Sequence, residues 1–469
     1  MKNIEGIGFK IYFHSGDIEL EKIQTPAIIF APINDRWNDF KFKCRYKYYF
    51  YYDKSRPPIH GRLFLGFLSQ NEYIDDSGKI SSNVDMLDES QFPDFFTLQG
   101  GMEEYRAFID NHGIDTSTLL LLELNDLVAS RRDTKRAKLI EEAVKTKVFN
   151  LAFMRDSDRF FAFHNADSIL DGLDKENFSK ISAQLSLSYK LAGFSGDHSF
   201  DLTFDTNSIL PKRICVLIGQ NGLGKSQALN AMVSSLLKGD SRFSDHKGER
   251  PIISRILAIA TPGETINTFP PEGINKRIKY RRLILNRNAR NKASRGFCEL
   301  CVQLCRSLEV IGNNDRWELF KESIQFFQNA NNIVIPLSSD ISVSASHVLA
   351  IKGKYYVPLL DLNYGGEQAA LEVQGAVIGN GNPMIKIDDS VYPLSSGQLS
   401  FIKFIMQACL FIENGTLVLL DEPETHLHPN FISEFVRVLD RLLKLTGSIS
   451  VIATHSAYFV REIPSSLLK

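Results

Sequence analysis

The sequence predicts an α/β fold for its second part, because three apolar runs there lead directly into functional-looking polar or glycine-rich residues. Ile214–Ile218 is a continuous apolar run, as expected for a strand that is buried on both faces. Leu417–Leu420 and Ile449–Ala453 are two further runs of this kind. In open α/β sheets, ligands bind at the carboxyl ends of such strands. The residues after these runs are therefore the first candidates for a functional site.

The composition is that of an ordinary soluble protein. Of the 469 residues, 43% are hydrophobic and 23% are charged, and the net charge is −1. Any electrostatic attraction to nucleic acid or to a membrane must therefore come from a local patch. No run approaches the ~20 apolar residues of a membrane span, and Met1–Glu5 lacks the apolar core of a signal peptide. We expect a cytoplasmic protein, with any membrane-embedded partner on another chain.

The chain is expected to divide near residue 180. Residues 1–180 mix short aromatic strands with helices and form an expected α+β region of unknown role. Within it, Cys44–Tyr52 predicts a strand and Arg136–Val148 predicts a helix. From there to the end, 181–469 carries the apolar strands described above, joined by alternating strands such as Leu185–Leu191. No heptad array is present, which argues against a long coiled-coil arm.

Six cysteines are too few for a disulfide scaffold in a chain of this length. Cys298, Cys301 and Cys305 form a local cluster whose spacing fits one face of a helix. Metal or redox chemistry is the alternative, but no second C-x-x-C and no histidine is nearby. We therefore favour a structural helix face.

A phosphate-binding loop follows the first apolar strand. Gly219–Ser226 is a full match to G-x-x-x-x-G-K-[ST], and an amphipathic helix, Gln227–Leu237, comes after it. The glycines let backbone N–H groups surround phosphates, and the helix directs its positive end at the same anion. Lys225 is expected to reach the β- and γ-phosphates and Ser226 to ligate Mg²⁺. The expected nucleotide contacts are Gly219, Asn221, Gly222, Gly224, Lys225, Ser226 and Gln227.

Two carboxylates end the strand Leu417–Leu420. Asp421 is expected to hold Mg²⁺ through water, and Glu422 to act as the general base for an attacking water. A solvated acidic turn is the alternative, but it does not explain why the acids follow an apolar strand.

A serine–glycine motif, Leu394–Gln398, opens an apolar helix that leads to this acidic strand. Such a pentapeptide is usually only a helix cap. Because a helix N-terminus with a free serine and glycine can bind phosphate, we identify Ser395, Ser396 and Gly397 as a candidate nucleotide contact.

A histidine, His455, follows the last apolar strand, Ile449–Ala453. A lone histidine is more often structural. In this position it is a candidate to contact the γ-phosphate and to register its loss, and we count it with Glu422 and Lys225 as a catalytic candidate.

Along the chain the four motifs are the P-loop, the serine–glycine motif, the acidic strand end and the histidine. In this order they resemble the ABC ATPase family over roughly residues 185–469, with Leu394–Gln398 in the place of that family's signature and His455 in the place of its switch histidine. The resemblance implies an ABC-type P-loop head with a mixed sheet, a helical and basic insertion at about 270–345, and ATP with Mg²⁺ as cofactors. It also implies that the signature of one subunit caps the ATP held by the P-loop of the other. ATP would then join the heads of a homodimer or of a higher oligomer.

The segment Asp421–Pro429 distinguishes branches of that family. Transporter ATPases usually carry a small residue, leucine and aspartate where this chain has His426, Leu427 and His428. The version with histidines resembles the soluble branch of overcoming-lysogenization-defect ATPases and of SMC- and RecF-like DNA-repair ATPases. With its ending Ala453–Ser456, the chain looks most like the PtuA-type ATPases of Septu and retron anti-phage systems. That likeness implies a separate effector protein, an HNH-type nuclease. The histidines are assigned to an inter-subunit contact, with a metal site as the alternative.

One departure from the family concerns hydrolysis. ABC ATPases usually place a glutamine after the first helix region, where it couples Mg²⁺ to the partner. The corresponding stretch here, Ile256–Thr265, contains no glutamine. Slow hydrolysis is therefore expected, with ATP binding as the more important event.

The stretch Lys276–Arg295 is basic and contains no acidic residue, in contrast to the nearly neutral chain. It is a candidate to bind nucleic acid phosphates. A solvated helix face and a docking surface for an acidic partner are the alternatives.

The sequence thus leaves three hypotheses. The first is a soluble ABC-type ATPase that dimerises on ATP and regulates an effector in anti-phage defence. The second is a DNA-repair ATPase that acts on DNA directly. The third is an ATP-binding scaffold with little turnover.

Overall fold

The computed structural model divides the chain into two compact units. One unit comprises residues 1–180 with 276–278, and the other comprises 181–275 with 279–469. The residues described are 8–14, 21, 23–33, 42–68, 87–88, 94–170, 182–191, 196–205, 213–220, 222–260, 268–273, 277–284, 296–307, 310–311, 314–325, 327, 329–338, 347–365, 367–427 and 429–463.

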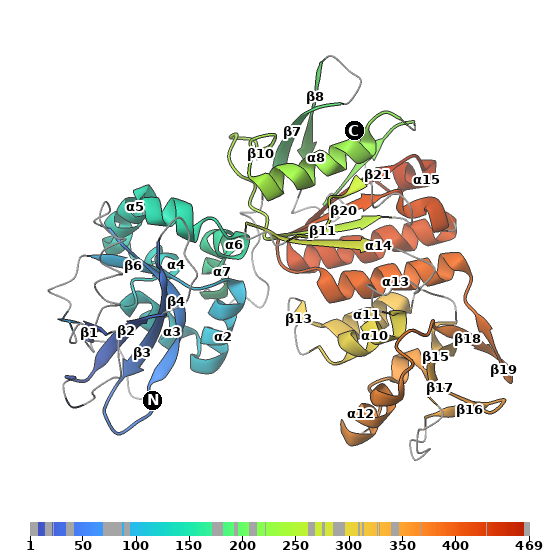
Figure 1. The fold of residues 1–469 in the computed structure, drawn as a ribbon, viewed down its shortest axis with the longest axis horizontal. Helices are drawn as coiled ribbons and strands as arrows, with labels where there is room; N and C mark the ends of the chain where they lie inside the picture. Colours follow the sequence, from blue (N-terminus) through green and yellow to red (C-terminus); the bar gives the residue numbers. More distant parts are fainter. Residues whose placement is uncertain are drawn as a thin grey trace. The chain divides into compact units, whose positions relative to one another are not determined.

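The N-terminal unit is an α+β structure (Figure 1). Its six-stranded sheet has the order β5-β1-β2-β3-β4-β6, in which only the pair β1 and β2 is parallel. The strands are β1 (Lys10–Phe13), β2 (Ala27–Pro32), β3 (Arg45–Tyr51), β4 (Ile59–Phe67), β5 (Leu87–Asp88) and β6 (Phe95–Leu98). The helices that follow are α2 (Met102–His112), α3 (Ile114–Glu123), α4 (Leu127–Ser130), α5 (Ala137–Lys145), α6 (Ser157–Asn165) and α7 (Asp167–Leu170). The expected aromatic strand and charged helix are confirmed as β3 and α5.

The second unit is built on a parallel five-stranded sheet with the order β12-β11-β20-β21-β9. The strands are β9 (Ile214–Ile218), β11 (Arg255–Ala260), β12 (Lys279–Ile284), β20 (Thr416–Asp421) and β21 (Ile449–Thr454). The three apolar runs of the sequence are thus confirmed as adjacent strands of one sheet. Because the strands are parallel, all five carboxyl ends lie along the same edge.

Helices cover both faces of this sheet. Figure 1 shows α8 (Lys225–Lys238) on one side and α13 (Ser396–Phe411) with α14 (Pro429–Thr446) on the other. The last helix is α15 (Ala457–Glu462). A separate antiparallel sheet has the order β10 (Phe243–Asp245), β7 (Gln184–Lys190) and β8 (Asp197–Thr203). In the sequence, β7 and β8 come before β9, and β10 comes after it. Parallel and antiparallel strands therefore both occur in the head.

The long connection from β12 to α13 forms its own layer. Its helices are α10 (Phe297–Cys305), α11 (Arg316–Ile324) and α12 (Glu367–Ala376). The sequence predicted helices here but not the five-stranded antiparallel sheet with the order β16-β17-β15-β18-β19. The strands of this sheet are β15 (Ile333–Leu337), β16 (Leu349–Ile351), β17 (Lys354–Pro358), β18 (Met384–Ile387) and β19 (Ser390–Pro393). A separate two-stranded antiparallel sheet is formed by β13 (Val310–Ile311) and β14 (Asn314–Asp315).

The cysteine cluster is confirmed as one buried face of α10. Cys298 and Cys301 are fully buried, and Cys305 is 7% exposed. Burial raises the pKa of Cys298 to about 12, so its thiol stays protonated and unreactive. Among the described residues, no group of three or more histidine, cysteine or acidic side chains is placed to hold a metal ion.

No helix within the described residues is both long and apolar enough to cross a membrane.

A buried arginine fixes the C-terminal end of α13. Arg316, at the start of α11, has no exposed surface in its side chain. Its Nη1 donates to the carbonyl oxygens of Cys409 and Ile412 at 2.7 and 3.2 Å, and its Nη2 binds the carboxylate of Glu413. One guanidinium therefore satisfies the free carbonyls at a helix end and neutralises a mostly buried acid.

We predict that Arg316→Leu lowers the free energy of unfolding by about 3–5 kcal/mol, because a mostly buried carboxylate loses the closer of its two cationic partners and two carbonyl oxygens lose their donor. Urea unfolding followed by the fluorescence of the buried Trp317 measures the loss. The control is Arg437→Leu, since the Arg437–Glu434 pair is solvent-exposed on the arginine side and is expected to contribute less than about 1 kcal/mol. Equal effects of the two substitutions would show that the buried network is not important.

Candidate functional site

The glycine-rich loop joins β9 to α8 with two glycines in the left-handed region. Gly222 has φ 89° and Gly224 has φ 85°, a conformation that a side chain disfavours. A Cβ on Gly224 would also lie 2.4 Å from Cδ1 of Leu191. The Lys225 ammonium donates to the carbonyl oxygens of Gly219 and Gln220 at 2.8 and 3.1 Å. The lysine is therefore held over its own loop, where phosphates bind in a P-loop. Asn221 lies outside the described residues.

A buried carboxylate ties this loop to the neighbouring strand. Asp421, the last residue of β20, is 1% exposed. The hydroxyl of Ser226 lies 3.1 and 3.2 Å from its two carboxylate oxygens, across 195 residues of sequence. A hydroxyl and a carboxylate at this spacing are hard oxygen ligands of the kind that Mg²⁺ prefers. The first turn of α8 also offers free N–H groups to an anion. The residues present therefore fit both ATP phosphates and Mg²⁺.

A third residue, which the sequence did not predict, completes this cluster. The hydroxyl of Thr268 donates to Asp421 Oδ2 at 2.7 Å, and Thr268 is 2% exposed. Its backbone carbonyl accepts a hydrogen bond from Asn230 of α8 at 2.9 Å. Thr268 comes from the segment after β11, where ABC ATPases have their coupling glutamine, but it lies beyond Ile256–Thr265. A single threonine has no motif around it, so only the structure reveals its position.

The acid after Asp421 is held in an unusual backbone conformation. Glu422 has φ 48° and ψ 52°, which costs of order 1–3 kcal/mol for a residue with a side chain. Its N–H donates to the carbonyl of Ala453 at 2.9 Å, so the end of β21 fixes the turn. The turn brings the Glu422 carboxylate to 3.4 Å from Nδ1 of His455. The proposed base and the proposed switch residue are therefore neighbours.

His455 also contacts a second acid, whose role the sequence did not indicate. Glu424 is nearly buried and accepts hydrogen bonds from the Thr454 hydroxyl and, at 3.1 Å, from the backbone N–H of His455. Its Oε1 lies 3.5 Å from Nδ1 of the imidazole. The imidazole itself is 49% exposed. Glu424 thus fixes the backbone of the histidine, while the ring remains accessible to a ligand or a partner.

The signature motif lies at the exposed beginning of α13. Ser395 is the N-cap, and its Oγ accepts from the Gln398 N–H while Gln398 Oε1 accepts from the Ser395 N–H. The interpretation of this motif as a helix cap is therefore correct for Ser395. The capping leaves Ser395 and Ser396 exposed, with Gly397 half-buried. A capped, exposed helix N-terminus remains compatible with a phosphate contact.

The expected site residues fall into two groups. The P-loop, Asp421, Glu422 and His455 come together, because Ile218 pairs with Thr454 and Asp421 with Ala453 at the carboxyl ends of adjacent strands. The signature stands apart on α13. Gln227 belongs to the first turn of α8. His428 and the side chain of His426 lie outside the described residues, as do Lys276 and 285–295 of the basic stretch.

Comparisons with known proteins agree with this site. Residues 389–461, which include the signature, Asp421 and His455, match the family described as "AAA domain, putative AbiEii toxin, Type IV TA system". The chain is similar to protein ea59 of Escherichia phage lambda, with 23% identity over 92% of this chain and 79% of the relative. It is also similar to the probable ABC transporter ATP-binding protein p29 of Mesomycoplasma hyorhinis, with 24% identity over 33% of this chain and 59% of that protein. The comparisons support an ATPase of the ABC/AAA type.

Two solved structures resemble this chain more distantly. UvrA2 from Deinococcus radiodurans is 16% identical with a TM-score of 0.29, and the match covers 63% of this chain and 37% of that one. Stu0660 of Streptococcus thermophilus is 14% identical with a TM-score of 0.26, over 58% of this chain and 69% of that one. Likenesses this weak do not bear on function.

We predict that Thr268→Val weakens the response of ATP hydrolysis to Mg²⁺ by roughly 10- to 100-fold, because a hydrogen bond to a charged group contributes about 1.5–3 kcal/mol. The valine keeps the volume of threonine but no longer fixes the Asp421 carboxylate. Hydrolysis is measured against Mg²⁺ concentration, and ATP binding without Mg²⁺ serves as the folding control. Thr268→Ser restores the hydroxyl and is expected to recover most of the response. An unchanged Mg²⁺ response in the valine variant would exclude a positioning role.

Proposed function

We propose that this chain binds ATP with Mg²⁺ at the P-loop, that two copies meet around the nucleotide, and that the ATP is hydrolysed there. The observation that carries the nucleotide site is the pair of contacts from Ser226 to Asp421 at the end of β20. These contacts join the two motifs that a P-loop NTPase uses for Mg²⁺. When bound, Mg²⁺ would supply charge neutralisation at the β- and γ-phosphates, with Ser226 and Asp421 as its protein ligands.

The residues beside this pair suit the remaining steps of phosphoryl transfer. Lys225 supplies positive charge at the loop, where negative charge collects on the phosphates. Glu422 is the general base that takes the proton of the attacking water. His455, which lies next to Glu422, contacts the γ-phosphate and registers its release. In this proposal Glu424 positions the histidine and does not touch the nucleotide.

The requirement for a second copy rests on the exposed signature. Ser395 and Ser396 present a capped helix N-terminus to solvent, and the imidazole of His455 is half exposed. Both are surfaces that a facing subunit can complete. The resemblance to ABC ATPases supports this arrangement, with a homodimer or a higher oligomer as the active form.

A finer part of the proposal concerns partners. By its resemblance to PtuA-type ATPases, the dimer would regulate a separate effector, an HNH-type nuclease, in anti-phage defence. The relative that aligns over most of the chain belongs to a bacteriophage, so this part rests on the sequence motifs alone. Co-purification from the native host tests it, because a nuclease in the eluate is expected and repeated purification of the chain without any protein partner would contradict it.

We predict that Lys225→Ala weakens ATP binding roughly 10- to 100-fold, since a charged hydrogen bond contributes about 1.5–3 kcal/mol. Calorimetric titration with ATP–Mg²⁺ measures the change. The matched control is Lys190→Ala, which removes an exposed lysine on β7. Normal ATP affinity in the Lys225 variant would remove the assignment of the P-loop.

We predict that Glu422→Gln retains ATP binding but lowers the rate of hydrolysis roughly 10²- to 10⁴-fold, the contribution typical of a general base. Because ATP then persists, the variant is expected to remain dimeric with ATP for longer than the wild type. Single-turnover hydrolysis and light scattering give the two readouts. A wild type without hydrolysis, together with function that survives the substitution, would favour a nucleotide-binding scaffold instead.

A further inference from the structure

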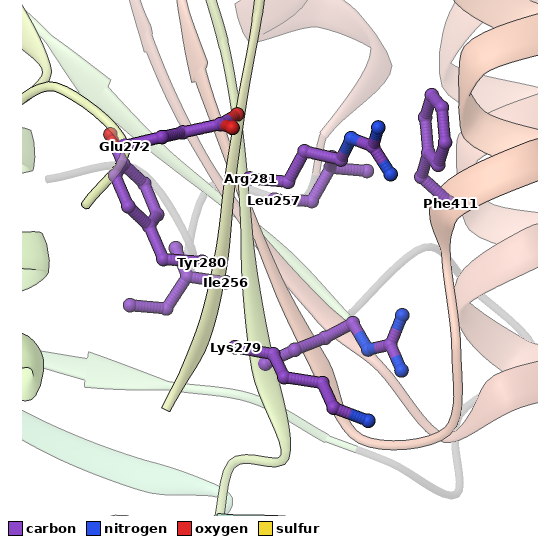
Figure 2. A pocket seen from close by; sticks show the side chains of 8 residues that line it. Ile256, Leu257, Glu272, Lys279, Tyr280, Arg281 and Phe411 are labelled. Atoms are coloured by element: carbon purple, nitrogen blue, oxygen red, sulfur yellow. The ribbon is translucent and has the colours of Figure 1, made fainter. Parts of the chain in front are cut away.

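A cavity of about 250 Å³ lies in the second unit, between β11, β12 and the end of α13 (Figure 2). Three of its lining side chains are cationic, namely Arg255, Lys279 and Arg281. The others that line it are Ile256, Leu257, Glu272, Tyr280 and Phe411. We call it the basic cavity.

The strand register explains why the cations gather on one side. Arg255 pairs with Lys279, and Leu257 pairs with Arg281, in the parallel ladder of β11 and β12. Paired residues point to the same face of a sheet, and residues two apart in a strand do so as well. The three cations therefore share the face that Phe411 of α13 approaches. Figure 2 shows Arg281 turned toward Phe411, with Glu272 and Tyr280 across the strand.

Among the described residues, Glu413 pairs with one of these cations and Glu272 lines the cavity, and both acids also have other partners. Glu413 lies 3.6 Å from Arg255, but it binds the buried Arg316 more closely. Glu272 accepts the backbone N–H of Arg282 at 2.6 Å.

One of the cavity arginines, Arg281, lies against an aromatic ring. The guanidinium carbon of Arg281 lies 3.8 Å from the centroid of the Phe411 ring. Such a cation–π contact uses the face of the planar group, whereas the N–H donors of a guanidinium point outward along its edge. An oriented guanidinium fits a phosphate with two parallel hydrogen bonds.

The cavity is too small for a whole cofactor. Drug-sized ligands occupy pockets of about 300–1,000 Å³, whereas this one measures about 250 Å³. It has room for a phosphate group and the atoms attached to it. We propose that the basic cavity binds a phosphate group, carried by a nucleic acid backbone or by a small phosphorylated molecule.

This site is separate from the nucleotide site. The cavity lies toward the amino ends of β11 and β12, whereas the P-loop, Asp421 and His455 lie at the carboxyl ends of the sheet. The strand β12 is also the outer strand of the sheet in the described residues. Lys279 and Arg281, the two cavity cations on this strand, belong to the basic stretch of the sequence. Residues 279–284 of that stretch form an edge strand, so the alternative of a solvated helix face is wrong for them. Several basic residues in sequence favour a ligand with several phosphates.

The test is phosphate binding by the full chain with ADP–Mg²⁺ at saturation, so that the P-loop is filled. The probes are a fluorescein-labelled 20-nucleotide single strand, the matching duplex, and inorganic pyrophosphate. We expect Arg255→Gln/Lys279→Gln/Arg281→Gln to weaken binding roughly tenfold or more at 100 mM salt. For DNA, the slope of log affinity against log salt falls by about one for each phosphate that is no longer neutralised. Loss of DNA binding identifies a nucleic acid as the ligand, and loss of pyrophosphate binding alone identifies a small phosphorylated molecule.

The matched control is Lys190→Gln/Lys354→Gln/Lys386→Gln, which removes three positive charges from β7, β17 and β18. A control that weakens binding as much as the cavity variant would overturn the proposal, because it would show a general charge effect. Wild type and cavity variant with equal binding of every probe would also overturn it. ADP affinity reports on folding and on the P-loop independently. If the triple variant loses ADP binding, Lys279→Gln alone leaves both arginines in place and is expected to weaken phosphate binding about threefold to tenfold.

Discussion

The arrangement of the head depends on the hydroxyl groups that converge on Asp421. Ser226 comes from the first turn of α8, and Thr268 comes from the segment after β11, yet both hydrogen-bond one buried carboxylate at the end of β20. A buried carboxylate without hydrogen-bond partners is costly, so the two hydroxyls stabilise the fold as well as position the carboxylate. The contact fixes the P-loop relative to the central strand, and it leaves oxygen atoms facing the place where Mg²⁺ would be held.

The neighbouring turn follows from the same constraint. Once β20 ends at the buried Asp421, Glu422 must leave the sheet directly, and it does so in a left-handed conformation fixed by the carbonyl of Ala453. That geometry brings its carboxylate beside His455, whose backbone is held by Glu424. The strain at Glu422 is thus stored where the proposed general base is positioned, as is common at catalytic sites.

The sequence was sufficient to predict the strands that carry the site, because β9, β20 and β21 are buried on both faces and appear as apolar runs. It also placed the P-loop glycines and the helix face of Cys298, Cys301 and Cys305. Thr268 was not predictable, because its partner is 153 residues away and no local pattern marks the contact. The antiparallel sheet of β15 to β19 was also missed. Several of its strands are short and have intermediate burial, so their alternation is weak.

The helix α13 connects the signature residues with the basic cavity, because it carries one at each end. Its 16 residues span about 24 Å at 1.5 Å per residue. Ser395 and Ser396 stand at its first turn, and Phe411 at its last turn forms part of the basic cavity. Arg316 locks that last turn through the carbonyls of Cys409 and Ile412. Because a packed helix moves as a rigid element, a phosphate bound by Arg281 against Phe411 would contact the same helix that, in the proposed dimer, presents Ser395 and Ser396 to the second copy.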